Sequence, residues 1–230
     1  MATNVPSLYR IRLSANNCYL LVADGAILVD SGLRGEGWFI LKSMEARGVD
    51  PAGLKLIVLT HGHADHCGSA SEIAAATGAP VAMRPEDACH VTAGLPVPAP
   101  PITHWARAIS WLLSTRLMRD VIPVPTIKPN VLLSAPEVPL ASYGVSATVV
   151  HTPGHTAGSV SILLPDGRAI VGDLAMNGFP STPLKPTPPI VAQDPGLLPG
   201  SWAAIGTRGA TVIFPGHGRP FPWASLDMRL

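Results

Sequence analysis

Short apolar runs separated by turn residues dominate the start of the chain. Apolar residues are concentrated in Leu8–Leu13, Cys18–Val22 and Ala26–Val29, with an Asn-Asn and an Asp-Gly dipeptide between them. Runs of this length bounded by such dipeptides are typical of strands joined in antiparallel hairpins. We therefore expect the chain to begin with three antiparallel strands of a first sheet.

Segments with helical spacing then alternate with further short apolar runs. Glu36–Arg47 carries apolar residues at helical spacing and is followed by Gly48, a residue that commonly ends a helix. Leu56–Leu59 predicts a strand, and the small residues of Ser69–Ala76 favour a second helix. Further on, the predicted strands are Pro80–Met83, Val145–Val150, Arg168–Gly172 and Thr211–Phe214, with a short helix at Leu197–Ile205 before the last. This alternation indicates an α/β fold.

Two stretches do not follow this pattern. The segment 96–129 is proline-rich at both ends and contains a helical candidate, Trp105–Met118, with an apolar stripe. The segment 178–200 holds seven prolines, and a loop of that length in a compact domain is usually functional or disordered. Because closely spaced prolines stiffen a loop, we expect 178–200 to form a rigid wall of a substrate pocket.

A cluster of metal-competent side chains follows the strand predicted at Leu56–Leu59. His61, His63, Asp65 and His66 lie within six consecutive residues of the stretch 60–68. Imidazole and carboxylate groups are the usual ligands of a first-row divalent metal, and four of them so close together can divide between two metals. A polar loop that carries histidines by chance is the alternative, and the rest of the chain argues against it.

Three other predicted strands also run into metal-competent residues. His151 and His155 flank a Pro-Gly turn after Val145–Val150, Asp173 follows Arg168–Gly172, and His217 follows Thr211–Phe214. Ligands at the ends of neighbouring strands can converge on one edge of a sheet. The sequence therefore predicts a site assembled by the fold from four separate segments.

These motifs, in this order, resemble the metallo-β-lactamase superfamily. The matching patterns are H-x-H-x-D-H after a strand, then H-T-P-G-H-T, G-D and G-H-G, and the stretch Ile27–Gly32 resembles the first motif of the family. The resemblance implies a four-layer αβ/βα sandwich with a dinuclear metal site between two sheets. It spans most of residues 1–230, so we expect a single domain in which about 96–129 is a cap-like insertion.

The resemblance also implies a role for each ligand. His61, His63 and His155 would hold one metal, Asp65, His66 and His217 the other, and Asp173 would bridge both. Zn²⁺ suits these donors, although Fe and Mn accept them too. A hydroxide between the metals would be the nucleophile, with Asp65 and Asp173 as the catalytic carboxylates. Asp30 would orient a ligand or its loop, whereas His151 is expected to make a hydrogen bond at a strand end.

The family resemblance leaves the reaction open. A hydrolase acting on an ester, thioester or lactone of a small, fairly apolar molecule is the preferred hypothesis. A mononuclear iron oxidoreductase, similar to the sulfur dioxygenases of the family, is the alternative, and a non-catalytic binding module is disfavoured because all ligands are present. A β-lactamase or phosphodiesterase is also disfavoured: subclass B1 β-lactamases have cysteine at the position of Asp173, and no basic exosite is visible.

Two enzyme classes of the family are also disfavoured by sequence differences. Homoserine-lactone lactonases with similar motifs typically have a tyrosine shortly after the bridging aspartate, whereas Leu174 to Met176 follow it here. The chain ends soon after His217, so we expect no appended helical domain of the glyoxalase II type. Several roles stay open for Trp105–Met118. From its pattern alone it can be a core helix or a membrane-surface helix, and the resemblance implies a cap over the site or a dimer contact as further alternatives.

Composition restricts the partners. The net charge is +1 without a long run of basic residues, so we expect no nucleic-acid partner. Charged residues make up 13% of the chain, against about 25% in typical domains, and the mean hydropathy is +0.31. Such a chain is expected to cover apolar surface by forming a homodimer or by binding apolar ligands. Three cysteines without a C-x-x-C pair, no leader-like segment and no apolar stretch that spans a bilayer predict a cytoplasmic protein.

Overall fold

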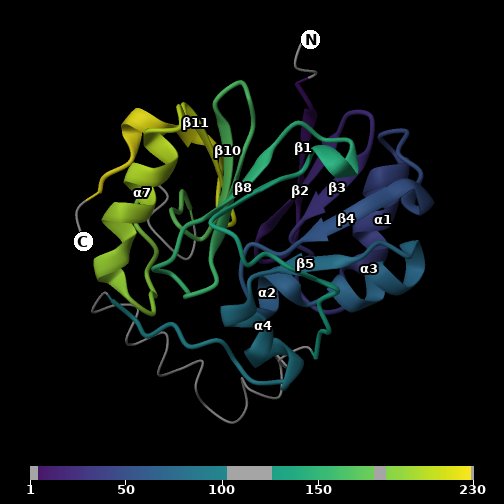
Figure 1. Cartoon of the computed structure of the whole chain (residues 1–230), viewed down its shortest axis with the longest axis horizontal. Helices are drawn as coiled ribbons and strands as arrows, with labels where there is room; N and C mark the ends of the chain where they lie inside the picture. Colours follow the sequence, from purple (N-terminus) through teal and green to yellow (C-terminus); the bar gives the residue numbers. More distant parts are fainter. Residues whose placement is uncertain (1–4, 103–125, 179–184, 229–230) are drawn as a thin grey trace.

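Two β-sheets packed face to face form the centre of the molecule, and helices cover their outer faces (Figure 1). The computed structural model describes residues 5–102, 126–178 and 185–228. The strands of the first sheet come from the part of the chain up to Leu132, and those of the second from Glu137 onward. The order of layers is helix, sheet, sheet, helix, as the sequence predicted.

The first sheet has six strands in chain order. The strands β1, β2 and β3 are antiparallel, and β3 to β6 are parallel. Their bounds are Ser7–Arg12, Asn17–Val22, Ala26–Val29, Leu54–Val58, Val81–Met83 and Val131–Leu132. The antiparallel opening predicted from the hairpin dipeptides is therefore confirmed.

The second sheet also has six strands, with the order β12-β11-β10-β9-β8-β7. All neighbouring pairs are antiparallel except β10 and β11, which are parallel. The bounds of β7 to β12 are Glu137–Pro139, Thr148–His151, Val160–Leu163, Arg168–Gly172, Val212–Pro215 and Phe221–Pro222. The parallel pair brings the C-terminal ends of β10 and β11 to the same edge of the sheet.

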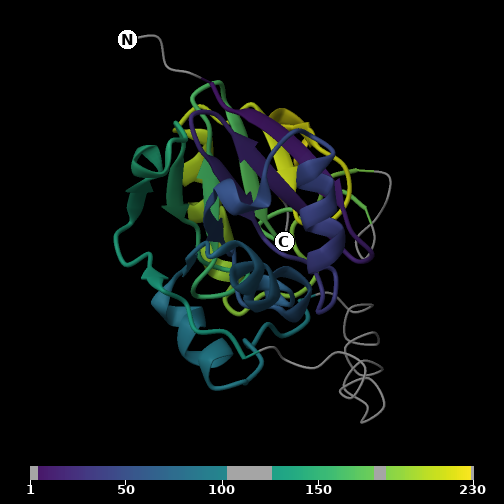
Figure 2. The ribbon, with the colours of Figure 1, turned by 90° about the vertical axis from the view of Figure 1, so that its right-hand side faces the viewer.

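The helices connect parallel strands and cover the outer faces of the sheets. Figures 1 and 2 show α1 (Gly37–Glu45) and α3 (Ala70–Thr77) against the first sheet, and α7 (Leu198–Gly206) lies against the second (Figure 1). Between β4 and α3, a single helical turn forms α2 (Ala64–Cys67), and α4 (Pro85–Thr92) follows β5. Among the described residues, no helix is long and apolar enough to cross a bilayer.

Three layers of buried side chains hold the elements together. Successive residues of a strand point to opposite faces, so Tyr19 and Leu21 enter the cluster between the sheets, whereas Cys18 and Leu20 pack under the helices of the first sheet. In the second sheet, Ile170 faces the other sheet, and its neighbours pack with α7. Burial of both faces explains why these strands are apolar throughout.

The structure differs from the sequence predictions at element boundaries and in four strands, β6, β7, β9 and β12, that were not predicted. The strand predicted at Val145–Val150 is observed at Thr148–His151, and the one predicted at Leu56–Leu59 begins at Leu54. Helix α4 was not predicted, because its apolar residues are few. The candidate helix Trp105–Met118 lies outside the described residues. Of the segment 96–129, the structure describes only 96–102 and 126–129.

Candidate metal centre

The seven predicted ligands lie together where the two sheets meet. His61 follows β4, and His63, Asp65 and His66 lie at or within α2, so the H-x-H-x-D-H segment is partly helical rather than a simple loop. The other three ligands come from the second half of the chain: His155 follows β8, Asp173 follows β10 and His217 follows β11. The fold thus brings together residues as far apart in the sequence as His61 and His217.

One group consists of three imidazoles. The Nε2 atom of His61 lies 3.1 Å from Nδ1 of His63 and 3.3 Å from Nε2 of His155, and the last two nitrogens are 3.0 Å apart. His61 and His155 are buried, whereas His63 is half-buried. Tetrahedral Zn–N bonds of about 2.0–2.1 Å place their nitrogens roughly 3.3–3.4 Å apart. The triangle of nitrogens is therefore close to the size that one metal ion requires.

A second group consists of Asp65, His66 and His217. The Nε2 atoms of the two histidines are 3.4 Å apart, and Asp65 Oδ2 lies 3.3 Å from that of His217 and 3.7 Å from that of His66. The histidine side chains are buried, whereas the Asp65 side chain is 29% exposed. The site therefore opens toward solvent beside Asp65.

Asp173 lies between the two groups. Its Oδ1 is 3.3 Å from His66 Nε2, and its Oδ2 is 3.3 Å from His217 Nε2 and 3.7 Å from His155 Nε2. The side chain is 5% exposed, and Oδ1 has no hydrogen-bond partner among the described residues. Because an unsatisfied buried carboxylate oxygen is costly, this position fits a group that accepts its lone pair, as a metal ion does.

Hydrogen bonds on the outer side fix the orientation of four imidazoles. The Nδ1 atoms of His155 and His217 face carbonyl oxygens, of Val191 at 2.8 Å and of Ala15 at 3.0 Å. A carbonyl only accepts, so each Nδ1 carries a proton and donates it. Nε2, which points into the site, is then the nitrogen that can bind a metal.

The other two imidazoles are held through Asp30, which the sequence predicted to orient a ligand. Its Oδ2 accepts from His66 Nδ1 at 2.8 Å and from the Thr60 hydroxyl at 2.8 Å, and its Oδ1 accepts from the Thr60 amide at 2.7 Å. Since the Thr60 hydroxyl donates to Asp30, its lone pair accepts from His61 Nδ1 at 3.0 Å. Asp30 is also the one non-glycine residue with positive φ, 62°, among the described residues.

The histidines of the two groups have pKa values shifted in opposite directions. Burial lowers the pKa of His61, His63 and His155, in the last case to about 3, so these rings are neutral. Burial opposes a charge on His217 as well, but the Asp173 and Asp65 carboxylates raise its pKa to about 10. In return, these two carboxylates have lowered pKa values despite their burial. The group at His217 is therefore suited to a positive charge, which a metal ion can supply in place of the proton.

Gly216 is required by close packing beside the site. A Cβ at this position would overlap Asp173 Oδ1 and lie 2.5 Å from His66 Cε1. The G-H-G motif thus leaves room for Asp173 and for His66 of the second group.

His151 is not among the candidate ligands. Its Nε2 bonds the Ala157 carbonyl at 2.9 Å, as the sequence predicted for a hydrogen-bonding histidine at a strand end.

Comparison with known proteins agrees with this arrangement. A family model described as the metallo-beta-lactamase superfamily matches residues 11–217. The chain belongs to this superfamily. A probable metallo-hydrolase of Methanocaldococcus jannaschii is 29% identical over 69% of this chain and 66% of its own length. Metallo-beta-lactamase domain-containing protein 1 of Xenopus laevis is 29% identical over 88% of this chain and 74% of its own.

Solved structures of the superfamily show the same fold. The BLEG-1 B3 metallo-beta-lactamase superposes with a TM-score of 0.69 at 22% identity, covering 95% of each chain. BJP-1, a subclass B3 enzyme of Bradyrhizobium japonicum, gives 0.61 at 21% identity over 92% of this chain and 75% of that one. The chain spans less than two thirds of the length of several curated relatives. For example, it covers 60% of an uncharacterized protein of Mycobacterium tuberculosis. The fold and family are therefore shown, and the activity is not.

Asp87, a buried carboxylate on α4, was not predicted from the sequence, and it connects the two loops that carry the candidate ligands His61, His63 and His155. Its Oδ2 accepts from the Gly62 amide at 2.9 Å and from the Thr156 hydroxyl at 2.8 Å, and its Oδ1 accepts from the Gly158 amide at 2.9 Å. Gly62 lies between two ligands, and Thr156 follows His155. No motif surrounds Asp87 in the sequence, and the one signal available is Pro85 two residues before it, since proline is common in the first turn of a helix.

Proposed function

We propose that this protein is a dinuclear metal-dependent hydrolase that acts on an ester, thioester or lactone of a small molecule. His61, His63 and His155 are assigned to one metal, Asp65, His66 and His217 to the other, and Asp173 to both. Zinc is the proposed metal, with iron or manganese as alternatives, because neutral imidazoles and carboxylates suit all three.

The position of Asp173 is the observation that carries this proposal. Its two oxygens reach nitrogens of both groups at 3.3–3.7 Å, and the oxygen nearest His66 lacks any other partner among the described residues. A carboxylate between two sets of ligands is the arrangement that holds two cations roughly 3.5–4 Å apart. A mononuclear iron site would leave a complete second set of ligands without a role.

The protein side chains have distinct tasks in such a reaction. Two bound metals would polarise a carbonyl group and lower the pKa of a water molecule. Asp65 is the carboxylate at the open side of the site, with 29% of its side chain exposed, so we assign it the orientation of the attacking water. Asp30, through His66 and Thr60, keeps the ligand nitrogens pointed into the site.

The proposed substrate class and assembly rest on composition and exposed surface. The low content of charged residues supports a fairly apolar substrate. On α1, Trp38 and Phe39 are 65% and 49% exposed, which supports a contact in a homodimer. The cytoplasmic location remains a prediction, supported by the three free cysteines, and no nucleic-acid partner is proposed.

A hydrolysis panel on the metal-loaded protein tests the reaction type. We expect turnover of aryl esters, acyl thioesters or lactones that stops on chelation and returns with zinc. Asp65→Asn keeps the shape of the side chain but weakens proton acceptance, so it should lower kcat about 100-fold or more. Asp166→Asn, in the exposed turn before β10, is the matched control. A silent panel together with iron-dependent oxygen consumption would reject the hydrolase in favour of the oxidoreductase.

A further inference from the structure

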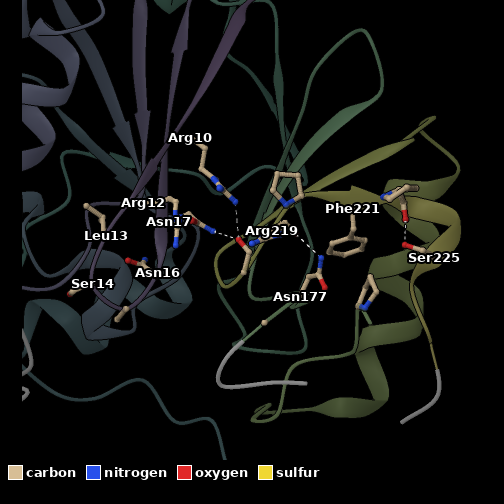
Figure 3. Close-up of a pocket in the computed structure, with 16 residues that line it drawn as sticks. Arg10, Arg12, Leu13, Ser14, Asn16, Asn17, Asn177, Arg219, Phe221 and Ser225 are labelled. Atoms are coloured by element: carbon tan, nitrogen blue, oxygen red, sulfur yellow. Dashed lines mark hydrogen bonds between the residues drawn. The ribbon is translucent and has the colours of Figure 1, made fainter. Parts of the chain in front are cut away.

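A cavity of about 790 Å³ lies beside the candidate metal centre, between β1 with its following loop and the segments that follow β10 and β11 (Figure 3). This size is within the range of small-molecule sites, roughly 300–1,000 Å³. Gly218 and Arg219 in its wall come directly after His217, and Ala15 in the opposite wall accepts the hydrogen bond of the His217 ring. The cavity is therefore adjacent to the metal centre but is lined by other residues.

The wall of the cavity is strongly positive. Arg10, Arg12 and Arg219 line it, and none of the described residues in its lining is an aspartate or glutamate. Among the described residues, no ion pair involves any of these three arginines, whereas Arg84, Arg168 and Arg208 each pair with a carboxylate. A second, smaller cavity shows the contrast, because there Arg208 lies beside Glu137. Of these two cavities, the one beside the candidate metal centre is lined by arginines without an ion pair among the described residues.

Strand β1 directs two of these arginines to the same side. Arg10 and Arg12 are two residues apart, so they project from the face of β1 opposite to Ile11, which is buried under the helices of the first sheet. In Figure 3, the residues of β1 and its loop lie on one side of the cavity, with Asn177 and Phe221 across from them. Arg10 is half-buried and Arg12 is exposed, so this pair of arginines does not serve core packing.

Asn16 supplies an independent observation in the same wall. Its side chain is 5% exposed, and neither its amide nitrogen nor its amide oxygen has a hydrogen-bond partner among the described residues. A buried amide can make several hydrogen bonds, and such groups are rarely left without one. An unsatisfied amide donor in the same cavity as three guanidinium groups without an ion pair is the donor set of an oxyanion site.

The cavity wall is also held in place by hydrogen bonds. The Gly218 carbonyl accepts from Arg10 Nη1 at 3.2 Å and from Asn17 Nδ2 at 2.9 Å, and Asn177 bonds the Arg219 carbonyl at 3.0 Å. Gly218 has a φ of 93°, and a Cβ there would overlap the Asn177 carbonyl. These bonds fix the backbone at Gly218 and Arg219. None of them involves the guanidinium group of Arg12 or Arg219.

We propose that this cavity binds the oxyanion of a small molecule, a carboxylate or a phosphate, through Arg12, Arg219, Arg10 and the Asn16 amide. The planar guanidinium groups match both anions, and Asn16 adds a neutral donor in the buried part of the wall. The proposal concerns binding alone and does not depend on the reaction at the metal centre.

Isothermal titration of the zinc-loaded protein with inorganic phosphate, and separately with acetate, tests the proposal at an ionic strength of about 0.15 M. We expect saturable binding of at least one anion, and the preferred probe identifies the oxyanion class. The double variant Arg12→Gln/Arg219→Gln should weaken this binding about tenfold or more. The control Arg47→Gln/Arg208→Gln removes the same charge elsewhere and should change it less than about twofold.

Asn16→Ala gives a second, structurally different test. Because the amide makes no hydrogen bond among the described residues, its removal should not lower the thermal midpoint, yet it should weaken anion binding. Anion held by the metals would bind equally well to the Arg12→Gln/Arg219→Gln protein. Equal binding there, or no saturable binding of either probe to the unmodified protein, would overturn the proposed site. Neither result bears on hydrolysis, which the ester and lactone panel measures independently.

Discussion

His66 donates its Nδ1 proton to Asp30 Oδ2 at 2.8 Å, and both side chains are almost fully buried. The bond joins a residue at the end of β3 to one in α2, and it leaves His66 Nε2 facing Asp173 at 3.3 Å. Asp30 binds Thr60 as well, and Thr60 in turn contacts His61. One carboxylate therefore orients a ligand in each of the two proposed groups.

Asp30→Asn should weaken metal binding without removing a ligand. The amide can no longer accept every one of these bonds, so His66 loses its fixed orientation. Loss of such a partner typically lowers metal affinity about 10–100-fold. Competition of the loaded protein with a chromogenic chelator measures this change, and Asp50→Asn, in an exposed turn, is the matched control. Unchanged affinity in Asp30→Asn would contradict the orienting role.

Asp87→Asn should affect mainly the group formed by His61, His63 and His155. Three donors converge on the Asp87 carboxylate, and an amide would direct its own N–H groups at some of them. The expected loss is about 1–3 kcal/mol of folding free energy, or a fall of roughly 2–12 °C in the thermal midpoint of a chain of this size. Scanning calorimetry with and without zinc checks it, with Asp50→Asn in its exposed turn as the matched control. An unchanged midpoint would show that Asp87 is not a structural link.

The metal-free protein should be most stable near pH 6.5. His155 has a pKa lowered to about 3 from 6.5, so unfolding takes up a proton below pH 6.5 and stability falls as the solution is acidified. His217 has a pKa raised to about 10 from 6.5, so its contribution is complete below pH 6.5 and is lost as the pH rises toward 10. Thermal midpoints in EDTA across pH 4–10 measure this curve.

Metal should remove the alkaline part of that dependence, because a bound cation takes the place of the His217 proton. The zinc-loaded protein is therefore expected to keep its thermal midpoint between pH 7 and 9, where the metal-free protein loses stability. The same fall with and without zinc would mean that His217 does not bind the metal.

Of the three cysteines, we expect only Cys89 to react rapidly with a thiol reagent. Cys18 and Cys67 are buried, and burial raises the pKa of both thiols, so neither forms a thiolate near neutral pH. Cys89 is exposed on α4. Titration with Ellman's reagent at pH 8 should give one fast thiol in the native protein and three after unfolding. Rapid reaction of Cys67 in the native state would indicate that the loop at the metal centre opens.

The sequence predicted the parts of this molecule that depend on local patterns. Apolar runs and turn dipeptides gave most of the strands, and the histidines and aspartates that follow four predicted strands gave seven residues that the fold does bring together. Asp87 and the arginine cavity were not predicted, because their function depends on contacts between distant segments. Arg12 and Arg219, for example, line the same cavity only after the two sheets pack. The proposed cap, 96–129, lies largely outside the described residues and stays a prediction.

Metal stoichiometry tests the central claim, a site for two ions with Asp173 between them, most directly. Elemental analysis of natively purified protein should find two zinc ions, or two iron or manganese ions, per chain. His217→Ala should retain about one, because His61, His63 and His155 remain intact. One iron per chain in the unmodified protein, unchanged by His217→Ala, would contradict the dinuclear site.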